Sequence, residues 1–319
     1  MSEVTKKLED IVGLGSATAQ KLRSSGYFTV ESIAVASPRE LSEAVGLSTE
    51  KAAEIAAYAR EILNIKFQTA EELLRRRTQI NRLTTNSKAL DKLLGGGVES
   101  QAVLELVGEY GTGKTQICHT LCATVQLPKN EGGLSGNAIY IDTEGTFRPE
   151  RLSQIVESKG LKTEESLKNV MVARAFNSDH QVLIAEKLDE LILEKNIKLV
   201  IVDSVISHFR AEYLGLKSLM ERQQRLNNHL HRLVRMAEVY NIPVIVTNQV
   251  LAVPDVFLGP TTKPAGGHVL AHLSTNRILL RKSKRDIRIA KIMDSPYLPE
   301  DECFFIINEC GISDVQDDT

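Results

Sequence analysis

The sequence predicts an α/β protein in which a mostly parallel, twisted sheet is flanked by helices and follows a small all-α domain. Four apolar segments with strand character alternate with helical stretches; they span residues 102–107, 138–142, 199–203 and 242–250. A glycine-rich loop joins the first of these segments to a helix-forming stretch. The first 64 residues have the apolar spacing of short helices.

Length and composition are typical of a globular protein of about two domains, with 319 residues of which 42% are hydrophobic and 25% charged. We expect domains at 1–64 and 81–313, a linker at 65–80 and a disordered acidic tail at 314–319. The net charge of −2 excludes a general basic field. Any polyanion must therefore be bound by local basic patches or by backbone amides.

No segment predicts export or a membrane span. The N-terminus is charged and lacks an apolar signal-peptide core, and no run of about 18 apolar residues occurs. Cys118 and Cys122 lie one helical turn apart in an apolar run, and neither they nor Cys303 and Cys310 have the usual zinc spacing. We expect Cys118 and Cys122 to be buried free thiols of a cytoplasmic protein.

Residues 1–64 contain a doubled element, because IVGLGSATAQKLRSSGY and AVGLSTEKAAEIAAYAREI both place V-G-L before a helix. Gly13, Gly15 and Gly46 permit tight turns with positive φ. A glycine turn that opens onto a helix N-terminus leaves N–H groups free to hold a phosphate. The pair resembles tandem helix-hairpin-helix elements, which bind the backbone of duplex DNA. The alternative is a helical bundle whose glycines serve packing alone.

The loop GEYGTGKT fits the nucleotide-binding pattern G-x-x-x-x-G-K-[ST] in the required strand–loop–helix context. Its backbone N–H groups can wrap a phosphate chain, Lys114 can reach the β- and γ-oxygens, and the Thr115 hydroxyl can bind Mg²⁺. The predicted nucleotide-binding residues of this loop are Gly108, Glu109, Tyr110, Gly111, Thr112, Gly113, Lys114 and Thr115.

Acidic residues end two of the other strands, at the edge where a parallel sheet binds its ligands. Asp203 ends LVIVD and suits the second partner of Mg²⁺. Glu144 lies just past AIYID and is the candidate base that orients the attacking water. Asp142 is its rival, since it lies two residues back on the same strand face.

Two further polar features belong to this edge. An arginine plane can stack on adenine, and we prefer Arg151 to Arg148 for this contact. Asn248 and Gln249 end the fourth strand, where a neutral amide can touch the γ-phosphate and relay its presence. The alternative for these amides is a simple polar cap of the strand.

The chain resembles the archaeal RadA-type recombinases, in the RecA family of strand-exchange proteins, from about residue 8 to 312. The stretches that carry the resemblance are GEYGTGKT, YIDTEGTFRPERL, ARAFNSDHQ, LVIVDS, FRAEY, ERQQ, VTNQV, GGHVLAH and DSPYLPE. It implies a RecA-like P-loop ATPase core that forms helical filaments on single-stranded DNA and catalyses homologous pairing and strand exchange in repair. It also implies ATP and Mg²⁺ as cofactors and association with the nucleoid.

The resemblance assigns roles to matching residues. Glu144 would be the catalytic carboxylate, acting with Lys114 and with Gln249, which would couple the γ-phosphate to the following loop. Arg151 would lie on adenine. The residues that would cap or sense the ATP of an adjacent subunit are Asp294, Pro299 and His272.

Two loops, at about 205–221 and 251–267, would meet DNA. The basic residues expected to contact its phosphates are Arg210, Lys217 and Arg222, with a solvated surface charge as the alternative for each. In the first loop, Leu216 stands where relatives have an arginine, and Lys217 can replace it only without the planar guanidinium. A basic hairpin can approach DNA or keep a sheet edge soluble; its cations are Arg281, Lys282, Lys284, Arg285, Arg288 and Lys291.

The linker stretch KFQTA carries an aromatic residue that calls for a partner. Phe67 and Ala70 resemble the F-x-x-A polymerisation motif of the same family. An extended segment can add as a strand to a neighbouring core, with its aromatic side chain in an apolar pocket, and the contact repeats head to tail. The alternative is that Phe67 packs on its own chain.

The expected partners are single- and double-stranded DNA and further copies of the chain, in a filament or a ring. Two alternatives stay open. A ring-forming RecA-core DNA motor would share the nucleotide site, but the hairpin repeat and the F-x-x-A stretch argue against it. A nucleotide-gated paralogue without strand exchange is the other, and Leu216 keeps it open.

Overall fold

The computed structural model describes residues 8, 11, 14–63, 67–215, 218–252, 262–284 and 286–315. Contacts between Cα atoms divide the chain into two compact units: Met1–Gln79 with Glu186–Leu193, and Ile80–Ala185 with Glu194–Thr319. The predicted all-α domain and all of the predicted linker except Ile80 fall in the first unit. The expected nucleotide-binding core falls in the second, except for Glu186–Leu193.

Short helices build the first unit: α1 (Ser16–Ser24), α2 (Val30–Val35), α3 (Pro38–Val45), α4 (Thr49–Ile62) and α5 (Ala70–Arg77). Ser37 and Glu40 form a capping box at the start of α3, and the Ser48 hydroxyl accepts from Lys51 N–H at the start of α4. Apolar side chains of α1 to α4 form one core, around Leu22, Ile33 and Ile55. The unit therefore has a hydrophobic core of its own.

The two glycine turns differ in their backbone. Gly46 ends α3 at φ +69°, where a residue with a Cβ would be strained, so this prediction is confirmed. Gly15 is the N-cap of α1 at φ −71°, and the expectation of a positive φ there is wrong. Any residue can adopt that conformation, so the backbone does not require glycine at this position. What Gly15 provides is the absence of a side chain in front of α1. Gly13 lies outside the described residues.

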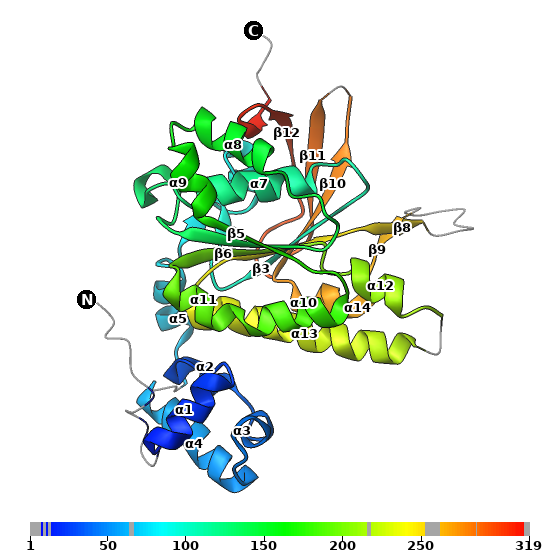
Figure 1. Cartoon of the computed structure of the whole chain (residues 1–319). Helices are drawn as coiled ribbons and strands as arrows, with labels where there is room; N and C mark the ends of the chain where they lie inside the picture. The colour runs from blue at the N-terminus through cyan, green and yellow to red at the C-terminus, as the bar shows by residue number, and fades with distance from the viewer. Residues whose placement is uncertain are drawn as a thin grey trace. The chain divides into compact units, whose positions relative to one another are not determined.

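The second unit is organised by a sheet that has nine strands within the described residues, in the order β13-β12-β11-β10-β3-β7-β6-β4-β5 (Figure 1). The strands from β10 to β5 are parallel to their neighbours, and β11, β12 and β13 continue the sheet antiparallel. The parallel strands are β3 (Val103–Gly108), β4 (Asn137–Asp142), β5 (Val170–Arg174), β6 (Ile197–Asp203), β7 (Val244–Asn248) and β10 (Asn276–Lys282). The antiparallel strands are β11 (Ile287–Asp294), β12 (Glu302–Asn308) and β13 (Gly311–Asp314).

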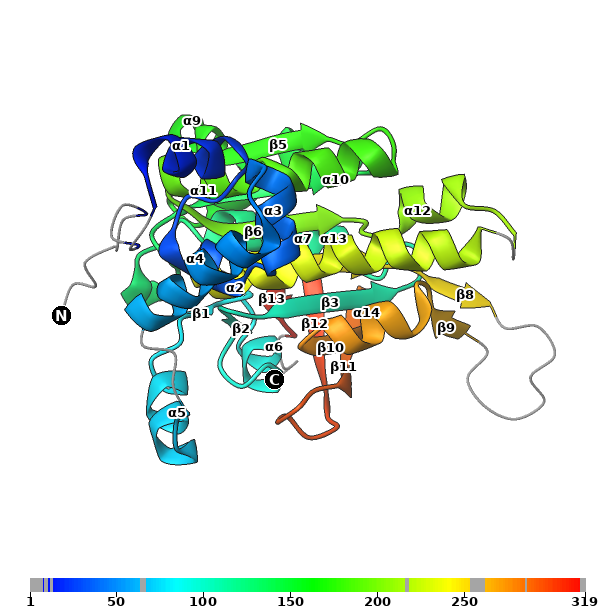
Figure 2. The ribbon, with the colours of Figure 1, turned by 90° about the horizontal axis from the view of Figure 1, so that it is seen from below.

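Helices cover both faces of this sheet, as expected for strands that are buried on both sides (Figures 1 and 2). The helices of one face are α7 (Lys114–Thr124), α8 (Pro149–Ser158) and α9 (Thr163–Lys168). Those of the other are α10 (Ser178–Glu186), α12 (Ser207–Glu212), α13 (Leu219–Tyr240) and α14 (Gly267–Leu273). The helix α11 (Leu188–Glu194) falls mostly in the stretch grouped with the first unit. All six residues of β3 are buried, and Leu104 and Leu106 face the α7 layer, so Glu105 points to the α13 side.

Smaller elements join these layers. They are β1 (Arg82–Leu83) paired with β2 (Val98–Glu99), α6 (Lys88–Leu93), a 3₁₀ turn at Lys129–Glu131, and the hairpin of β8 (Val250–Ala252) with β9 (Thr262–Pro264). The hairpin and the start of α14 form the described part of the predicted second DNA loop, and residues 253–261 lie outside the described chain. In the predicted first loop, α12 and the start of α13 flank Leu216 and Lys217, which are also outside the described residues.

The predicted disordered tail at 314–319 is wrong at its first residue. Asp314 ends β13, and its carboxylate accepts hydrogen bonds from Ser87 Oγ at 2.6 Å, Ala89 N–H at 2.9 Å and Lys88 N–H at 3.0 Å. The carboxylate therefore caps the N-terminus of α6, a contact that joins the two ends of the second unit. Residues 316–319 lie outside the described chain.

Candidate nucleotide site

The loop between β3 and α7 has a backbone that needs its glycines. Gly111 and Gly113 have φ +74° and +109°, and a Cβ on Gly108 would lie 2.6 Å from the carbonyl oxygen of Leu280. Gly113 is the N-cap of α7 and provides no side-chain cap, so the first N–H groups of this helix remain available to an anion. The glycine spacing predicted from the sequence is thus required by the loop itself.

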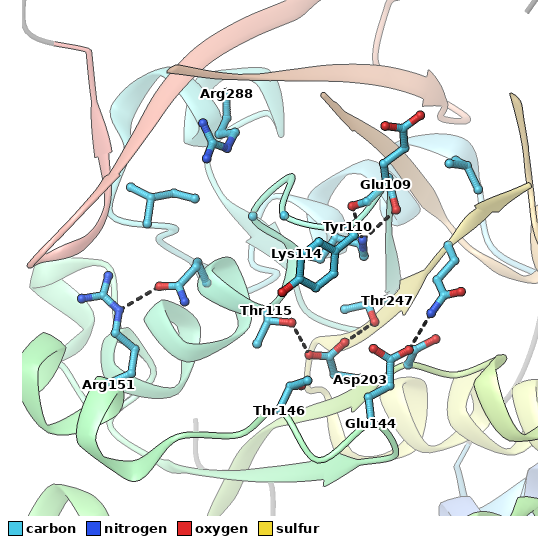
Figure 3. A pocket seen from close by; sticks show the side chains of 18 residues that line it. Glu109, Tyr110, Lys114, Thr115, Glu144, Thr146, Arg151, Asp203, Thr247 and Arg288 are labelled. Atoms are coloured by element: carbon cyan, nitrogen blue, oxygen red, sulfur yellow. Dashed lines mark hydrogen bonds between the residues drawn. The ribbon is translucent and has the colours of Figure 1, made fainter. Parts of the chain in front are cut away.

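This loop borders a cavity of about 760 Å³ at the carboxyl edge of the parallel strands (Figure 3). The lining residues are Gly108, Glu109, Tyr110, Gly111, Gly113, Lys114, Thr115, Gln116, Glu144, Thr146, Arg151, Asp203, Ser204, Thr247, Gln249, Val250, Arg288 and Ile307. The cavity unites every predicted residue of the loop except Thr112. Thr112 is buried, and its hydroxyl closes the loop by donating to Glu109 O at 2.9 Å.

Lys114 and Thr115 begin α7 at the floor of the cavity. Lys114 Nζ donates to Gly108 O at 2.7 Å and to Glu109 O at 2.8 Å, and burial lowers the pKa of its ammonium. Thr115 Oγ1 donates to Asp203 Oδ2 at 2.8 Å. Asp203 also accepts from the hydroxyls of Tyr140, at 2.5 Å, and Thr247. The predicted partners of Mg²⁺ are therefore neighbours.

The residues that line the cavity fit magnesium better than they fit a metal ion whose ligands are all protein side chains. Within the described residues no group of three or more His, Cys, Asp or Glu side chains could hold a metal ion. Mg²⁺ is commonly held by one or two protein oxygens together with phosphate oxygens and water. Thr115 and Asp203 provide one hydroxyl and one carboxylate beside a loop built for phosphates.

The two carboxylates after β4 have different surroundings. Asp142 is buried and accepts from the N–H groups of Glu144, Gly145 and Thr146 at 3.1, 2.7 and 3.2 Å, and from that of Phe147 at 3.2 Å. Arg174 also pairs with it, at 3.2 Å. These donors hold the carboxylate inside the loop, and Asp142 does not line the cavity.

Glu144 lines the cavity and contacts an amide across it. Gln249 Nε2 donates to Glu144 Oε1 at 2.7 Å, and Arg210 Nη1 donates to Gln249 Oε1 at 3.2 Å. Withdrawal of the Glu144 carboxyl from water, and then its proximity to Asp203, raise its pKa. One chain of hydrogen bonds thus joins the candidate base, the amide after β7 and a basic residue on α12.

The other end of the cavity is lined by arginines. Arg151 on α8 donates from Nε to Gln116 Oε1 at 2.8 Å and from Nη2 to Asn308 O at 2.5 Å, which holds its guanidinium plane at the cavity wall (Figure 3). Arg148 donates to carbonyls of its own loop, Gly145 O and Phe147 O, and does not line the cavity. The geometry favours Arg151 as the stacking plane.

Seven lining residues were not predicted from the sequence: Gln116, Thr146, Ser204, Thr247, Val250, Arg288 and Ile307. Arg288, which was noticed only as part of the basic hairpin, faces the cavity from β11, and its buried Nε has no partner among the described residues (Figure 3). Thr247 and Thr146 lie beside Asp203 and Glu144. Only their positions in the sequence could have indicated that they line the cavity, since Thr247 precedes the two amides at the end of the strand and Thr146 follows Glu144. A threonine by itself does not indicate a nucleotide site.

Three predicted nucleotide contacts lie away from this cavity. Asp294 ends β11, Pro299 follows it in the same turn, His272 is on α14, and all three are exposed. Ser295 anchors the turn that carries Asp294 and Pro299, because its hydroxyl donates to Asn276 Oδ1 at 2.7 Å and accepts from Leu298 N–H at 3.1 Å. None of the three lines the cavity of its own chain.

The predicted DNA and assembly residues are also placed. Arg222 lies near the start of α13, and its buried Nε has no partner among the described residues. Phe67 is fully exposed, so packing on its own chain is not observed. Ala70 is the first residue of α5, which Thr69 caps through Glu72, so the extended part of the motif ends at Thr69. Cys118 and Cys122 are free and buried, as predicted.

Two family models match the chain, one for each predicted domain. A family model described as Rad51 matches residues 76–315, and one described as a SAM-like helix-hairpin-helix tandem matches residues 5–61. The DNA repair and recombination protein RadA of Metallosphaera sedula is 51% identical over 313 residues, 98% of this chain and 97% of the relative. That of Aeropyrum pernix is 51% identical over 309 residues, 97% of each chain. Among the described helices, none is long and apolar enough to cross a membrane.

Proposed function

This chain belongs to the Rad51 family, and on that premise we propose that it assembles head to tail on single-stranded DNA with ATP and Mg²⁺ held between successive cores. It is a recombinase of DNA recombination and repair, a DNA-dependent ATPase with strand-exchange activity. It acts on DNA and forms oligomeric filaments. Chromosomal DNA as its substrate implies that it works in the cytoplasm, on the nucleoid.

ATP binds in the cavity with its phosphates on the glycine loop. Lys114 would exchange its carbonyl partners for the β- and γ-oxygens. Thr115 and Asp203 would hold Mg²⁺, and the ion would supply charge neutralisation at the phosphates. Arg151 stacks on the adenine at the far end of the cavity. Glu144, with its raised pKa, orients the water that attacks the γ-phosphate.

One observation carries the proposal: Gln249 is bonded both to Glu144, in the cavity, and to Arg210, on α12. A γ-phosphate beside Glu144 competes for the Gln249 amide, because its charged oxygens accept hydrogen bonds as the carboxylate does. Gln249 then releases Arg210, which becomes free to contact a DNA phosphate. Hydrolysis reverses the exchange, so the nucleotide state sets the DNA-contacting residues.

Exposure of Asp294, Pro299 and His272 away from their own cavity supports their use against the ATP of a neighbour. Such a shared nucleotide makes the junction between subunits depend on ATP. The linker provides the second contact of the junction, through Phe67 and Ala70 on the sheet edge of the next core. The two contacts repeat head to tail and generate a filament.

The helical domain adds a contact to duplex DNA. Gly15 and Gly46 are exposed beside the N-termini of α1 and α4, where backbone N–H groups can hold phosphates without a basic field. The domain thereby recruits the incoming duplex. Pairing itself is read by the bases of the two nucleic acids, since phosphate contacts carry no sequence information.

A strand-exchange assay with homologous and heterologous duplex tests the proposal against its alternatives. Joint molecules that require homology support the recombinase. Unwinding that ignores homology supports a ring-forming motor, and binding without either supports a regulatory paralogue. Electron microscopy with single-stranded DNA and a non-hydrolysable ATP analogue then shows the assembly directly, and a chain that stays monomeric under these conditions contradicts the filament.

A further inference from the structure

A buried carboxylate lies in the middle of the sheet, away from the nucleotide cavity, and has no role in the proposed hydrolysis of ATP. Glu105 belongs to β3, between β10 and β7, and its side chain is completely buried. Its Oε2 accepts from Arg277 Nε at 2.6 Å, and its Oε1 accepts from Asn248 Nδ2 at 2.7 Å. A protein with three apolar side chains at such a site is often as stable as one with a buried ion pair, so stability alone does not explain these three residues.

Asn248 links this carboxylate to a loop. The second hydrogen of Asn248 Nδ2 is donated to Ala265 O at 2.8 Å, and Ala265 N–H donates to Gln249 O at 2.8 Å. Gln249 precedes β8 and Ala265 follows β9, so the two bonds close the neck of the β8–β9 hairpin. Both partners of Nδ2 are acceptors, which fixes the orientation of the amide.

The unused atom of the amide points to the same conclusion. Asn248 Oδ1 is buried, and no group of the described chain donates to it. Leaving an acceptor without a donor is unfavourable, and a residue that only filled the core would avoid it. The amide is therefore retained for the two hydrogen bonds of its nitrogen.

Alternation along the strand places the two amides on opposite faces. Gln249 lines the cavity, whereas Asn248 is buried against Glu105 and does not line it. Of the two amides at the end of the strand, only Gln249 lines the cavity where a γ-phosphate would lie. A movement of the Gln249 side chain can reach the hairpin only if the backbone beside it is held, and Asn248 holds it.

Two further elements are attached to this trio. Ala265 leads into Gly266, the N-cap of α14, the helix that carries His272. Arg277 follows Asn276, the residue to which Ser295 anchors the turn of Asp294. The trio therefore touches the neck of the hairpin and lies next to both elements proposed to contact a neighbour's ATP.

We propose that Asn248, oriented by Glu105 and Arg277, is a positioning residue that fixes the neck of the second DNA loop against Gln249 and so couples the nucleotide to DNA. The inference rests on the proposed function. Asn248 touches neither ATP nor Glu144. Its loss is expected to uncouple hydrolysis from DNA and to leave the chemistry of the cavity intact.

The first test is Asn248→Leu, compared with Thr124→Val, which removes the hydrogen bond from the buried Thr124 hydroxyl on α7 to Thr84 O. ATP hydrolysis is measured with and without single-stranded DNA, together with KM for ATP. For Asn248→Leu we expect an unchanged KM and DNA-free rate, a loss of stimulation by DNA of about tenfold, and faster hydrogen exchange at the Ala265 amide. Thr124→Val should keep its stimulation.

The second test separates positioning from stability. The variant E105L/N248L/R277M replaces the whole trio by apolar side chains, which leaves no buried charge unpaired and preserves folding even where N248L alone unfolds. It too should bind ATP normally and lose DNA stimulation. Normal stimulation in this variant, or an equal loss of ATP binding and stimulation in N248L, overturns the inference. Failure of the parent chain itself to respond to DNA would instead contradict the proposed function.

Discussion

Truncation of Phe67 to alanine is the most direct perturbation of assembly. The ring is fully exposed on the single chain, so its whole apolar surface is available for burial on a neighbour. Aromatic anchors of this kind typically contribute about 2–4 kcal/mol when truncated. At about 1.4 kcal/mol per factor of ten, Phe67→Ala should weaken each subunit junction roughly 30- to 1,000-fold.

The change can be measured without DNA and with it. Sedimentation velocity over a concentration series gives the self-association of the free protein, and electron microscopy with single-stranded DNA and a non-hydrolysable ATP analogue gives filament length. Phe67→Leu keeps apolar surface and should show an intermediate loss. Val35→Ala, which truncates another exposed apolar residue in α2, is the matched control and should assemble normally.

Nucleotide binding by the free chain separates assembly from the site. Phe67 does not line the cavity, so Phe67→Ala should bind a fluorescent ATP analogue with the affinity of the parent chain as long as both are monomeric. If the variant sediments and forms filaments as the parent does, the strand-addition hypothesis is wrong. If it loses ATP binding as well, the linker has a role in folding that exposure does not reveal.

Three other outcomes follow from the site and the core. Glu144→Gln should lower the rate of ATP hydrolysis by about 10²–10⁴ and keep ATP binding, so that filaments persist on DNA in a pelleting assay. In the parent chain the pKa of Glu144 is raised above the ordinary value of 4.5, so kcat should begin to fall with acidification at a higher pH than an ordinary glutamate would give. Lys114→Ala should abolish nucleotide binding, measured by calorimetry, and with it the ATP-dependent filaments. Burial lowers the pKa of His229 from 6.5 to about 4, so the unfolded chain takes up a proton between these values and the folded chain does not; urea unfolding should show a loss of about 3 kcal/mol across that window, and His229→Gln should remove this part of the slope.

Local sequence predicted the parts of the site that are local in space. The glycine loop, Lys114 and Thr115 are consecutive, and their strand–loop–helix context fixes their geometry. Asp203 was predictable because carboxyl ends of parallel strands meet at one edge of the sheet, and it lies next to Thr115. The fold class follows from the same alternation of strands and helices.

Contacts between distant segments decided what the sequence could not. Asp142 and Glu144 are two residues apart on the same strand end, and only the folded loop shows that four backbone N–H groups saturate Asp142. In the sequence, Arg288 is one of several cations of a basic hairpin. Only the position of β11 in the fold shows that its side chain lines the cavity. Asp314 looks like the start of an acidic tail, yet α6 needs its carboxylate as a cap.

The end of β7 explains how one strand can serve three purposes. Thr247 donates to Asp203, the proposed magnesium partner; Asn248 holds Glu105 and the neck of the β8–β9 hairpin; Gln249 contacts Glu144 and Arg210. Because neighbouring side chains on a strand point to opposite faces, Thr247 and Gln249 face the cavity while Asn248 faces Glu105 and the neck of the hairpin. Under the proposed function, a change at Gln249 has a short covalent path to the loop, and we propose that the buried trio holds the backbone through which this change acts.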